Sequence, residues 1–313
     1  MTVPVASAPS AWDFFADRLF RALAKAGAYL IVLLLAFILW QIGRKAMPGI
    51  RDYGLGFLTS TTWDVGRGHF GILPAIWGTL YSSFLALVIG GFFGVVMAIF
   101  LTQDFLPPRL AVVFRTTVEL LAAIPSVVYG LWGIFVVVPA IRPGADWLYA
   151  HLGAIPLFGS TLSGPGLLPA ALVLAIVILP TVAAVSQDAL RQVPYRVKEA
   201  AFGMGTTRWE AILKVMLPTA ATGIFGALVL GFGRALGETM ALAMLIGNSN
   251  QLTLSLFSPA NTLAALLALN FPEAGPREVA VLMYAALVLL AITLLVNIAG
   301  GAIMAMAGRK VGK

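Results

Sequence analysis

Apolar runs long enough to cross a lipid bilayer recur along this chain, and they constrain its fold more than any other feature. A membrane-spanning helix needs about 20 apolar residues at a rise of about 1.5 Å per residue. Of the 313 residues, 60% are hydrophobic and only 11% are charged. Soluble domains carry about 25% charged residues, so this composition predicts an all-α, polytopic membrane protein. The six predicted spans lie at about residues 26–42, 78–101, 117–140, 167–187, 219–247 and 279–307.

The available side chains exclude several kinds of site. The chain has no cysteine, which excludes disulfides, thiolate metal sites and cysteine nucleophiles. Only His69 and His151 could supply imidazole ligands, and both are expected in loops. The phosphate-binding motif GxxxxGK[ST] is absent, so we expect no ATP binding or hydrolysis by this chain. The sequence therefore predicts no catalytic, cofactor-binding or metal-binding residues.

Lys and Arg are distributed unevenly between the two sides of the predicted spans. Thirteen lie on the side that holds both termini, six lie on the other side, and Arg234 lies inside a span. Cytoplasmic loops carry an excess of these residues, so we expect both termini in the cytoplasm of a bacterium, with the spans in its inner membrane. The four basic residues at 44–67 run against this rule. The net charge of +7 is explained by this bias and not by a nucleic-acid partner.

The resulting organisation is a single membrane domain with short tails. It consists of a cytoplasmic tail at 1–25, a first span at 26–42, a periplasmic loop at 43–77, a transmembrane domain at 78–307 and a cytoplasmic tail at 308–313.

The most polar long segment between two spans, residues 188–218, is predicted to form two short helices joined by a bend; we call it the elbow. Pro194 suits the first turn of the first helix, and Gly203 and Gly205 suit its end. Thr207 and Glu210 have the spacing of a capping box that starts the second helix. Its apolar residues are expected on one face: Trp209, Ile212, Leu213, Met216 and Leu217. Such a segment indicates either a docking site for a soluble partner or a loop lying on the membrane surface.

Two charged residues, Arg234 and Glu238, lie within the fifth span. Charges in the bilayer are costly, so such residues usually face a bundle interior or a wet path. At positions i and i+4 they could form a buried ion pair. Alternatively, Arg234 could offer forked donors to a tetrahedral oxyanion. Glu238 could then accept the proton of hydrogen phosphate and exclude fully ionised anions such as sulfate. With Thr239 they form the predicted substrate path.

Pro125 interrupts the third span. It removes one helix hydrogen bond and frees the carbonyl of Leu121. The adjacent Ser126 could line the substrate path, or the proline could simply kink the helix. In the fifth span, Gly233 and Gly237 form a small-residue pair that allows close approach of another helix.

The elbow resembles the EAA loop of ABC importer permeases. The matching residues are Glu199, Ala200, Ala201, Gly205, Leu217 and Pro218, and Val215 stands where the family usually has Ile. The resemblance implies a bundle of the type I importer permeases, in which the elbow is a cytoplasmic coupling helix that docks on an ATPase. Trp209 is then expected at that contact.

Three further motifs narrow the resemblance. GRALGETMA in the fifth span, AIPSVVYGLWG in the third and WDVGRGHFGILPAIWGTL before the second are similar to permeases of phosphate-specific ABC transporters of the PstC type. This resemblance implies a heterodimer with a second permease in the lipid bilayer, a cytoplasmic ATPase dimer that binds Mg-ATP and a periplasmic phosphate-binding protein. Three alternatives stay open: an importer of another oxyanion (molybdate, sulfate or phosphonate), a proton-coupled secondary anion transporter, and a membrane-embedded enzyme.

Overall fold

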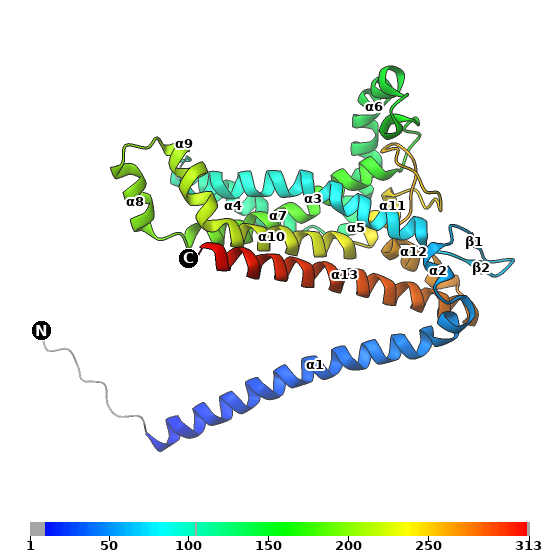
Figure 1. The fold of residues 1–313 in the computed structure, drawn as a ribbon, viewed down its shortest axis with the longest axis horizontal. Helices are drawn as coiled ribbons and strands as arrows, with labels where there is room; N and C mark the ends of the chain where they lie inside the picture. The colour runs from blue at the N-terminus through cyan, green and yellow to red at the C-terminus, as the bar shows by residue number, and fades with distance from the viewer. Residues whose placement is uncertain (1–9, 104, 312–313) are drawn as a thin grey trace, which may run out of the picture.

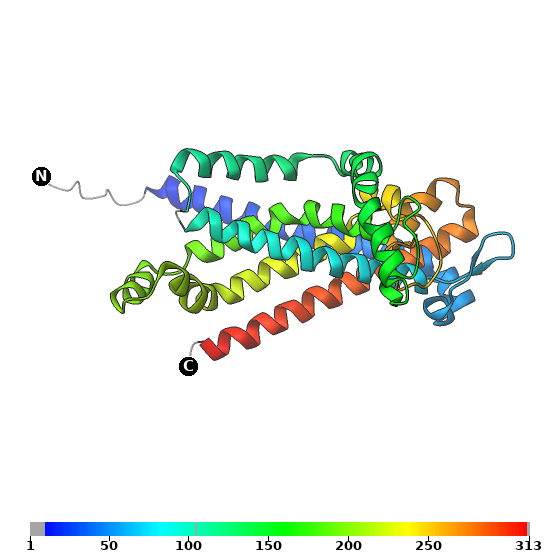
Figure 2. The same ribbon diagram turned by 90° about the horizontal axis from the view of Figure 1, so that it is seen from above.

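In the computed structural model, which describes residues 10–103 and 105–311, long helices run alongside one another (Figures 1 and 2). The helical segments are α1 (Ala11–Tyr53), α2 (Gly56–Thr59), α3 (Leu73–Thr102), α4 (Pro108–Ala123), α5 (Ser126–Trp132), the π-helix η1 (Gly133–Val137), α6 (Val138–Leu152), η2 (Pro156–Phe158), α7 (Leu167–Arg191), α8 (Tyr195–Gly203), α9 (Arg208–Glu210), the π-helix η3 (Ala211–Met216), α10 (Leu217–Gly237), α11 (Met240–Leu245), α12 (Leu263–Asn270), η4 (Phe271–Glu273) and α13 (Pro276–Val311). Two short strands, β1 (Trp63–Asp64) and β2 (His69–Phe70), form an antiparallel hairpin.

Six helical runs among the described residues are long and apolar enough to cross a membrane, as predicted. They are Phe14–Tyr53, Leu73–Thr102, Ser126–Leu152, Leu167–Arg191, Arg208–Gly237 and Pro276–Met306. The protein is therefore a multi-pass, all-α membrane protein.

Several predicted boundaries differ from the structure. Helix α1 begins at Ala11 and ends at Tyr53, so the first span is much longer than residues 26–42 and includes most of the predicted tail. The predicted loop at 43–77 contains the end of α1, the hairpin and the start of α3. Helix α13 continues to Val311, past the predicted start of the last tail at 308. Residues 1–9 and 312–313 of the predicted tails lie outside the described residues.

The two histidines do not lie in irregular loops. His69 is in β2 and His151 is in α6, where its ring stacks on Trp147 at 4.6 Å.

Close packing of α3 against α7 forms the centre of the bundle. A Cβ atom on Gly90 would lie 2.5 Å from the carbonyl oxygen of Ala175, and one on Gly94 would lie 2.9 Å from Val182 Cβ. A side chain at either position would collide with α7, so only glycine permits this approach. Small residues are typical where membrane helices pack closely. Helix α7 is the most buried of the six spans.

Helix α1 lies apart from the bundle over most of its length. At its C-terminal part, Ala46 and Gly49 pack against α13, where a Cβ on Gly49 would meet the Ala280 carbonyl. Its most apolar stretch has no buried residue. Figure 1 shows α1 diverging from α13 toward its N-terminal end.

The two ends of the bundle differ. The elbow lies at one end, together with the first turns of α1 and the end of α13 (Figures 1 and 2). The hairpin, α6 and α12 lie at the opposite end.

Candidate functional site

The fifth span breaks at Glu238. Helix α10 ends at Gly237, and Glu238 has an extended backbone with φ −67° and ψ 126°. Thr239 then precedes α11, and its hydroxyl donates to the Gly237 carbonyl at 3.1 Å. The expectation of Arg234 and Glu238 on one helix face is therefore wrong. Within the described residues, no ion pair joins them, because Glu238 has already left the helix.

Arg234 instead contacts the neighbouring helix. Its Nη1 donates a hydrogen bond of 3.1 Å to the hydroxyl of Thr181 in α7. The side chain of Arg234 is exposed at the surface of this chain, so its remaining donors are free to meet an anion or a partner.

The third predicted span also breaks, at Ile124 and Pro125, so that α4 and α5 are separate helices. As predicted, Pro125 leaves the Leu121 carbonyl without its usual helix donor. The carbonyl accepts instead from the Tyr129 hydroxyl at 2.7 Å and from the Ile124 amide at 3.4 Å. Ser126 is the first residue of α5 and is half-buried. Its hydroxyl makes no hydrogen bond with Arg234, Glu238 or Thr239 in the described chain.

Helices α5 and α11, each of which begins just after a break, pack against each other. A Cβ on Gly130 would lie 2.7 Å from Met244 Sδ and 3.4 Å from Ala241 Cα. The conformation of both breaks thus brings Ser126 and Thr239 to the starts of two adjoining helices. The structure places all four predicted path residues at or near the helix breaks, with Arg234 one turn before its own break.

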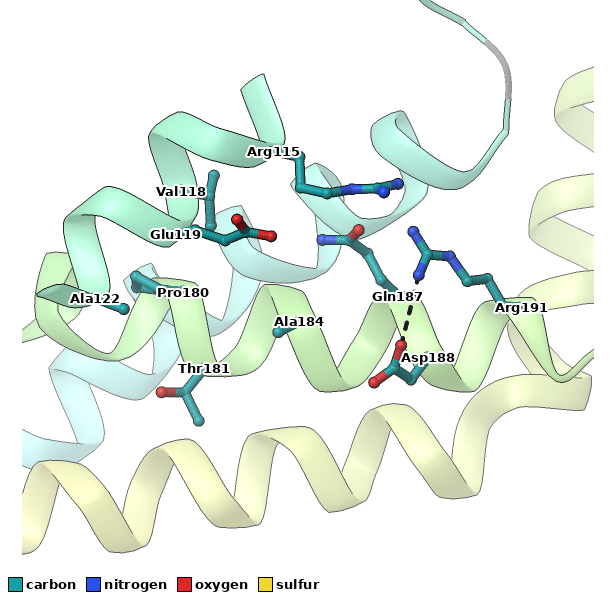
Figure 3. Close-up of a pocket in the computed structure, with 10 residues that line it drawn as sticks. All are labelled: Arg115, Val118, Glu119, Ala122, Pro180, Thr181, Ala184, Gln187, Asp188 and Arg191. Carbon is teal, nitrogen blue, oxygen red and sulfur yellow. Dashed lines mark ion pairs between the residues drawn. The ribbon is translucent and has the colours of Figure 1, made fainter. Parts of the chain in front are cut away.

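A cavity of about 360 Å³ lies between α4 and α7 (Figure 3). Thr181, the partner of Arg234, forms part of one end, and Arg191 forms part of the other. Charged residues of both helices line it, a feature that our sequence reasoning missed. The lining residues are Arg115, Val118, Glu119, Ala122, Pro180, Thr181, Ala184, Gln187, Asp188 and Arg191.

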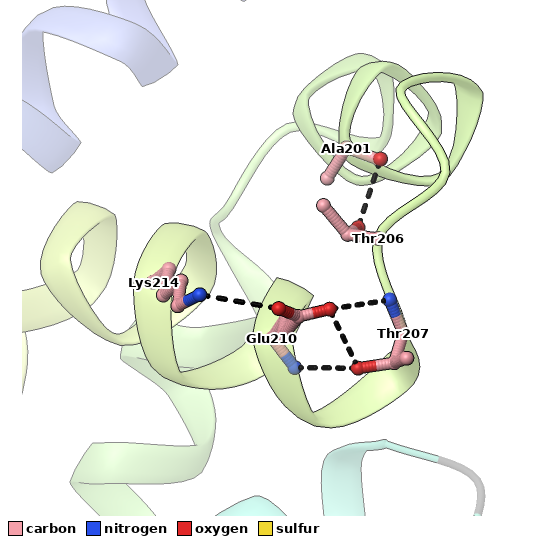
Figure 4. Close-up of polar contacts among 5 residues, drawn as sticks. All are labelled: Ala201, Thr206, Thr207, Glu210 and Lys214. Atoms are coloured by element: carbon pink, nitrogen blue, oxygen red, sulfur yellow. Dashed lines mark hydrogen bonds and ion pairs between the residues drawn. The ribbon is translucent and has the colours of Figure 1, made fainter.

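The elbow has the predicted bend and cap (Figure 4). Helix α8 ends at Gly203, and Gly205 has a φ of +81°, a conformation that glycine adopts without strain. The Thr206 hydroxyl donates to the Ala201 carbonyl at 2.8 Å and so closes the bend.

The capping box is complete. The Thr207 amide donates to Glu210 Oε2 at 3.0 Å, and the Glu210 amide donates to the Thr207 hydroxyl at 3.4 Å. Lys214 Nζ holds Glu210 Oε1 at 3.1 Å. Pro194 is the residue just before α8 and not in its first turn.

The apolar residues of the second elbow helix do not share one face. Ile212 and Met216 are buried, but Trp209 is 57% exposed and Leu213 is 56% exposed. The segment η3 is a π-helix, whose wider turn shifts the positions that face the bundle.

The connection between α3 and α4 packs against the second elbow helix. The sequence did not predict this contact. The Trp209 ring lies 5.3 Å from the Phe105 ring, and the Arg208 guanidinium lies 4.4 Å from the same ring. Arg208 also donates to the Gln103 carbonyl. Glu199 lines a cavity of about 190 Å³ beside Gln103 and Arg208, and the described residues give Glu199 no ion pair.

Helical structure is continuous from the elbow to Arg234. Helix α9, η3 and α10 follow one another without a break from Arg208 to Gly237, with Leu217 and Pro218 at the start of α10. Trp209 and Arg234 therefore lie on one uninterrupted helical run, which can transmit a displacement between them.

Comparison with known proteins identifies the family. Residues 90–313 match the family described as binding-protein-dependent transport system inner membrane component. The phosphate transport system permease protein PstC of Pasteurella multocida is 40% identical over 288 residues, which cover 90% of this chain and 89% of that protein. The chain belongs to the PstC family of permeases.

Other relatives agree with this assignment. The PstC protein of Xylella fastidiosa strain Temecula1 is 36% identical over 96% of this chain and 94% of its own length. The probable PstC protein of Methanocaldococcus jannaschii is 35% identical over 90% of this chain and 91% of its own.

Solved structures show the same fold at lower identity. A chain of a bacterial alginate ABC transporter, solved with its periplasmic protein, is 19% identical, with a TM-score of 0.58 over 92% of this chain and 98% of that chain. A chain of the MetNI methionine ABC transporter, also 19% identical, has a TM-score of 0.55 over 75% of this chain and 95% of that chain. The predicted importer-permease fold is confirmed.

Proposed function

We propose that this chain is a permease subunit of an ATP-driven importer of inorganic phosphate. The observation that carries the proposal is the set of PstC relatives, which are named as phosphate transport permeases and match 90% or more of this chain at 35 to 40% identity. The substrate path would pass Arg234, Glu238, Thr239 and Ser126, and no catalytic residue is assigned to this chain.

The chemistry of the break in the fifth span suits a protonated oxyanion. Arg234 presents forked N–H donors that match the oxygens of phosphate. Glu238 has no ion pair in the described chain, so its carboxylate is available to accept the proton that hydrogen phosphate carries. Sulfate carries no proton at neutral pH, so the Glu238 carboxylate would repel it.

The elbow would be the contact with a cytoplasmic ATPase dimer. Glu199, Ala200, Ala201, Gly205, Trp209, Leu217 and Pro218 are the residues proposed to form or shape this contact. Trp209 and Glu199 are exposed, as docking residues must be, and they belong to α9 and α8, which lie at the elbow end of the bundle (Figure 1). ATP and Mg²⁺ would be bound by the ATPase, and closure of the ATPase would move α9, η3 and α10 together.

The elbow, the N-terminal end of α1 and the C-terminal end of α13 would face the cytoplasm. The opposite end, with the hairpin and α6, would then face the periplasm and receive a phosphate-binding protein. Arg234 is exposed when this chain is considered without partners, and a second, homologous permease would complete the path beside it. Lipid would cover the outer helices.

Two other functions make different predictions. An importer of molybdate, sulfate or phosphonate would keep the ATPase but prefer another anion. A proton-coupled secondary transporter would take up anion without an ATPase, and it would leave the ordered elbow without a role.

Purification from the native membrane in mild detergent tests the assembly. We expect an ATPase and a second permease to co-purify with this chain. Uptake of radiolabelled phosphate by the reconstituted complex should be inhibited by excess unlabelled phosphate and not by sulfate or molybdate. Equal inhibition by sulfate or molybdate would contradict phosphate as the substrate.

A further inference from the structure

The cavity between α4 and α7 runs from Thr181, the hydrogen-bond partner of Arg234, toward the elbow end of the bundle. It reaches from Thr181 to Arg191. These residues are ten positions apart on one helix, or about 15 Å at about 1.5 Å per residue. Since Arg234 donates to Thr181, the cavity adjoins the proposed substrate path at one end.

Two arginines reach into this cavity from different helices. Figure 3 shows the guanidinium groups of Arg115, from α4, and Arg191, from α7, extending toward the same space beside Gln187. Arg191 Nη1 lies 3.7 Å from Asp188 Oδ1, which leaves most of its donors unused. Arg115 has no ion pair or hydrogen bond within the described chain. Facing guanidinium groups supply the forked donors that tetrahedral oxyanions accept.

Gln187 adds a third donor beside the two arginines. Its side chain lines the cavity and is only 6% exposed, yet its amide has no hydrogen-bond partner among the described residues. The fully buried side-chain atoms without a partner lie elsewhere in the described chain, so this amide is open to the cavity. It can therefore donate to a ligand there. An oxyanion between the two arginines would accept a hydrogen bond from this amide.

Two carboxylates, Glu119 and Asp188, line the cavity beside these donors and restrict which anion fits. Glu119 lies one helical turn beyond Arg115, and Figure 3 shows its carboxylate pointing into the cavity. An anion that still carries a proton can donate to this carboxylate, whereas a fully ionised anion is repelled. This is the combination of charges already found at Arg234 and Glu238.

We propose that Arg115, Gln187 and Arg191 form an inner oxyanion site, which holds protonated phosphate in transit between Arg234 and the elbow end. The inference rests on the proposed function and adds a second binding position to the path. The phosphate group of an anionic lipid has the same chemistry, and α4 is exposed, so the test must separate free phosphate from lipid.

The absence of cysteine makes this cavity accessible to thiol labelling. An Ala184→Cys variant places a single thiol of this chain in the cavity wall, and Ala122→Cys does so from α4. In the complete complex in neutral detergent without anionic lipid, we expect an anionic methanethiosulfonate to react faster than a cationic one because of the two guanidinium groups, with Glu119 and Asp188 reducing the preference. Inorganic phosphate should slow the reaction, and sulfate should not.

Substitutions identify the groups responsible. Arg115→Gln with Arg191→Gln should abolish both the reagent preference and the protection by phosphate. Arg109→Gln is the matched control, because it removes a positive charge from the first turn of α4 outside the cavity, and it should preserve both. Phosphate uptake by the Ala184→Cys complex shows that the variant folds.

Two results would overturn the inner oxyanion site. One is equal labelling by the two reagents with no protection by inorganic phosphate. The other is protection by nanodiscs containing phosphatidylglycerol but not by inorganic phosphate, which would assign the arginines to lipid. Either result in a complex that still imports phosphate leaves the proposed function intact, whereas a complex that imports no phosphate contradicts the proposed function itself.

Discussion

The guanidinium of Arg234 donates a hydrogen bond of 3.1 Å to the hydroxyl of Thr181 and so joins α10 to α7. Helix α10 continues without a break from the elbow, while α7 is the most buried span. Movement of the elbow against α7 would therefore change the position of Arg234 relative to Thr181. We propose that this contact orients Arg234 in one state of the transport cycle.

Replacing Thr181 tests this contact. Thr181→Val keeps the shape of the side chain and removes the acceptor of Arg234. A hydrogen bond to a charged group contributes about 1.5–3 kcal/mol, so phosphate uptake should fall roughly tenfold or more. Initial rates in proteoliposomes measure this effect. Thr181→Ser retains the hydroxyl and should stay near the wild-type rate; an equal loss in both variants would point to packing instead.

Glu238→Gln tests the basis of anion selection. The amide can donate to a fully ionised anion, which the carboxylate repels, so sulfate should become a competitor of phosphate uptake. The measurement is inhibition of labelled phosphate uptake by sulfate in the variant and in the wild type. Unchanged uptake together with unchanged rejection of sulfate would remove Glu238 from the selection mechanism.

Local chemistry made part of the elbow predictable. Thr207 and Glu210 form their capping box within four residues, and Gly205 takes a positive φ that few other residues tolerate. Both features depend on neighbours in sequence, so a pattern reveals them. The six spans were predictable for a related reason, since helix length in a bilayer follows from hydrophobicity.

Tertiary structure decided the remaining features. The break at Glu238 follows a glycine, but no proline lies near it in the sequence. The continuous apolar pattern therefore predicted an unbroken span. The inner oxyanion site joins Arg115 to Arg191, which only the packing of α4 beside α7 brings together. The exposure of Leu213 between the buried Ile212 and Met216 occurs in a π-helical segment that no sequence motif predicts.

The capping box should matter for coupling between ATP hydrolysis and transport. Thr207→Ala removes the cap at a cost of about 1 kcal/mol and should loosen the start of the second elbow helix. We expect phosphate transported per ATP hydrolysed to fall while the complex still assembles. Thr207→Ser, which retains the hydroxyl, is the control. Normal coupling in Thr207→Ala would show that the cap is dispensable for transmission.

Gly90 should tolerate no side chain. A Cβ there would lie 2.5 Å from the Ala175 carbonyl oxygen, so Gly90→Ala must push α3 away from α7. Overpacking of this kind costs about 1–3 kcal/mol, which should lower the unfolding temperature of the purified complex. Gly27→Ala in α1 is the matched control, because a Cβ added there would meet no atom of a neighbouring element within 4 Å. Equal unfolding temperatures for the two variants would contradict the packing described here.

The central claim is that a nucleotide-driven movement of the elbow carries phosphate past Arg234, and ATP-driven uptake in proteoliposomes tests it most directly. The complex would be reconstituted with its ATPase, second permease and binding protein, with Trp209→Ala and Arg234→Gln compared in parallel. We predict phosphate uptake that requires ATP, falls strongly in both variants, and in Trp209→Ala also loses its link to ATP hydrolysis. Phosphate uptake without ATP, or full ATP-driven uptake by both variants, would contradict the account.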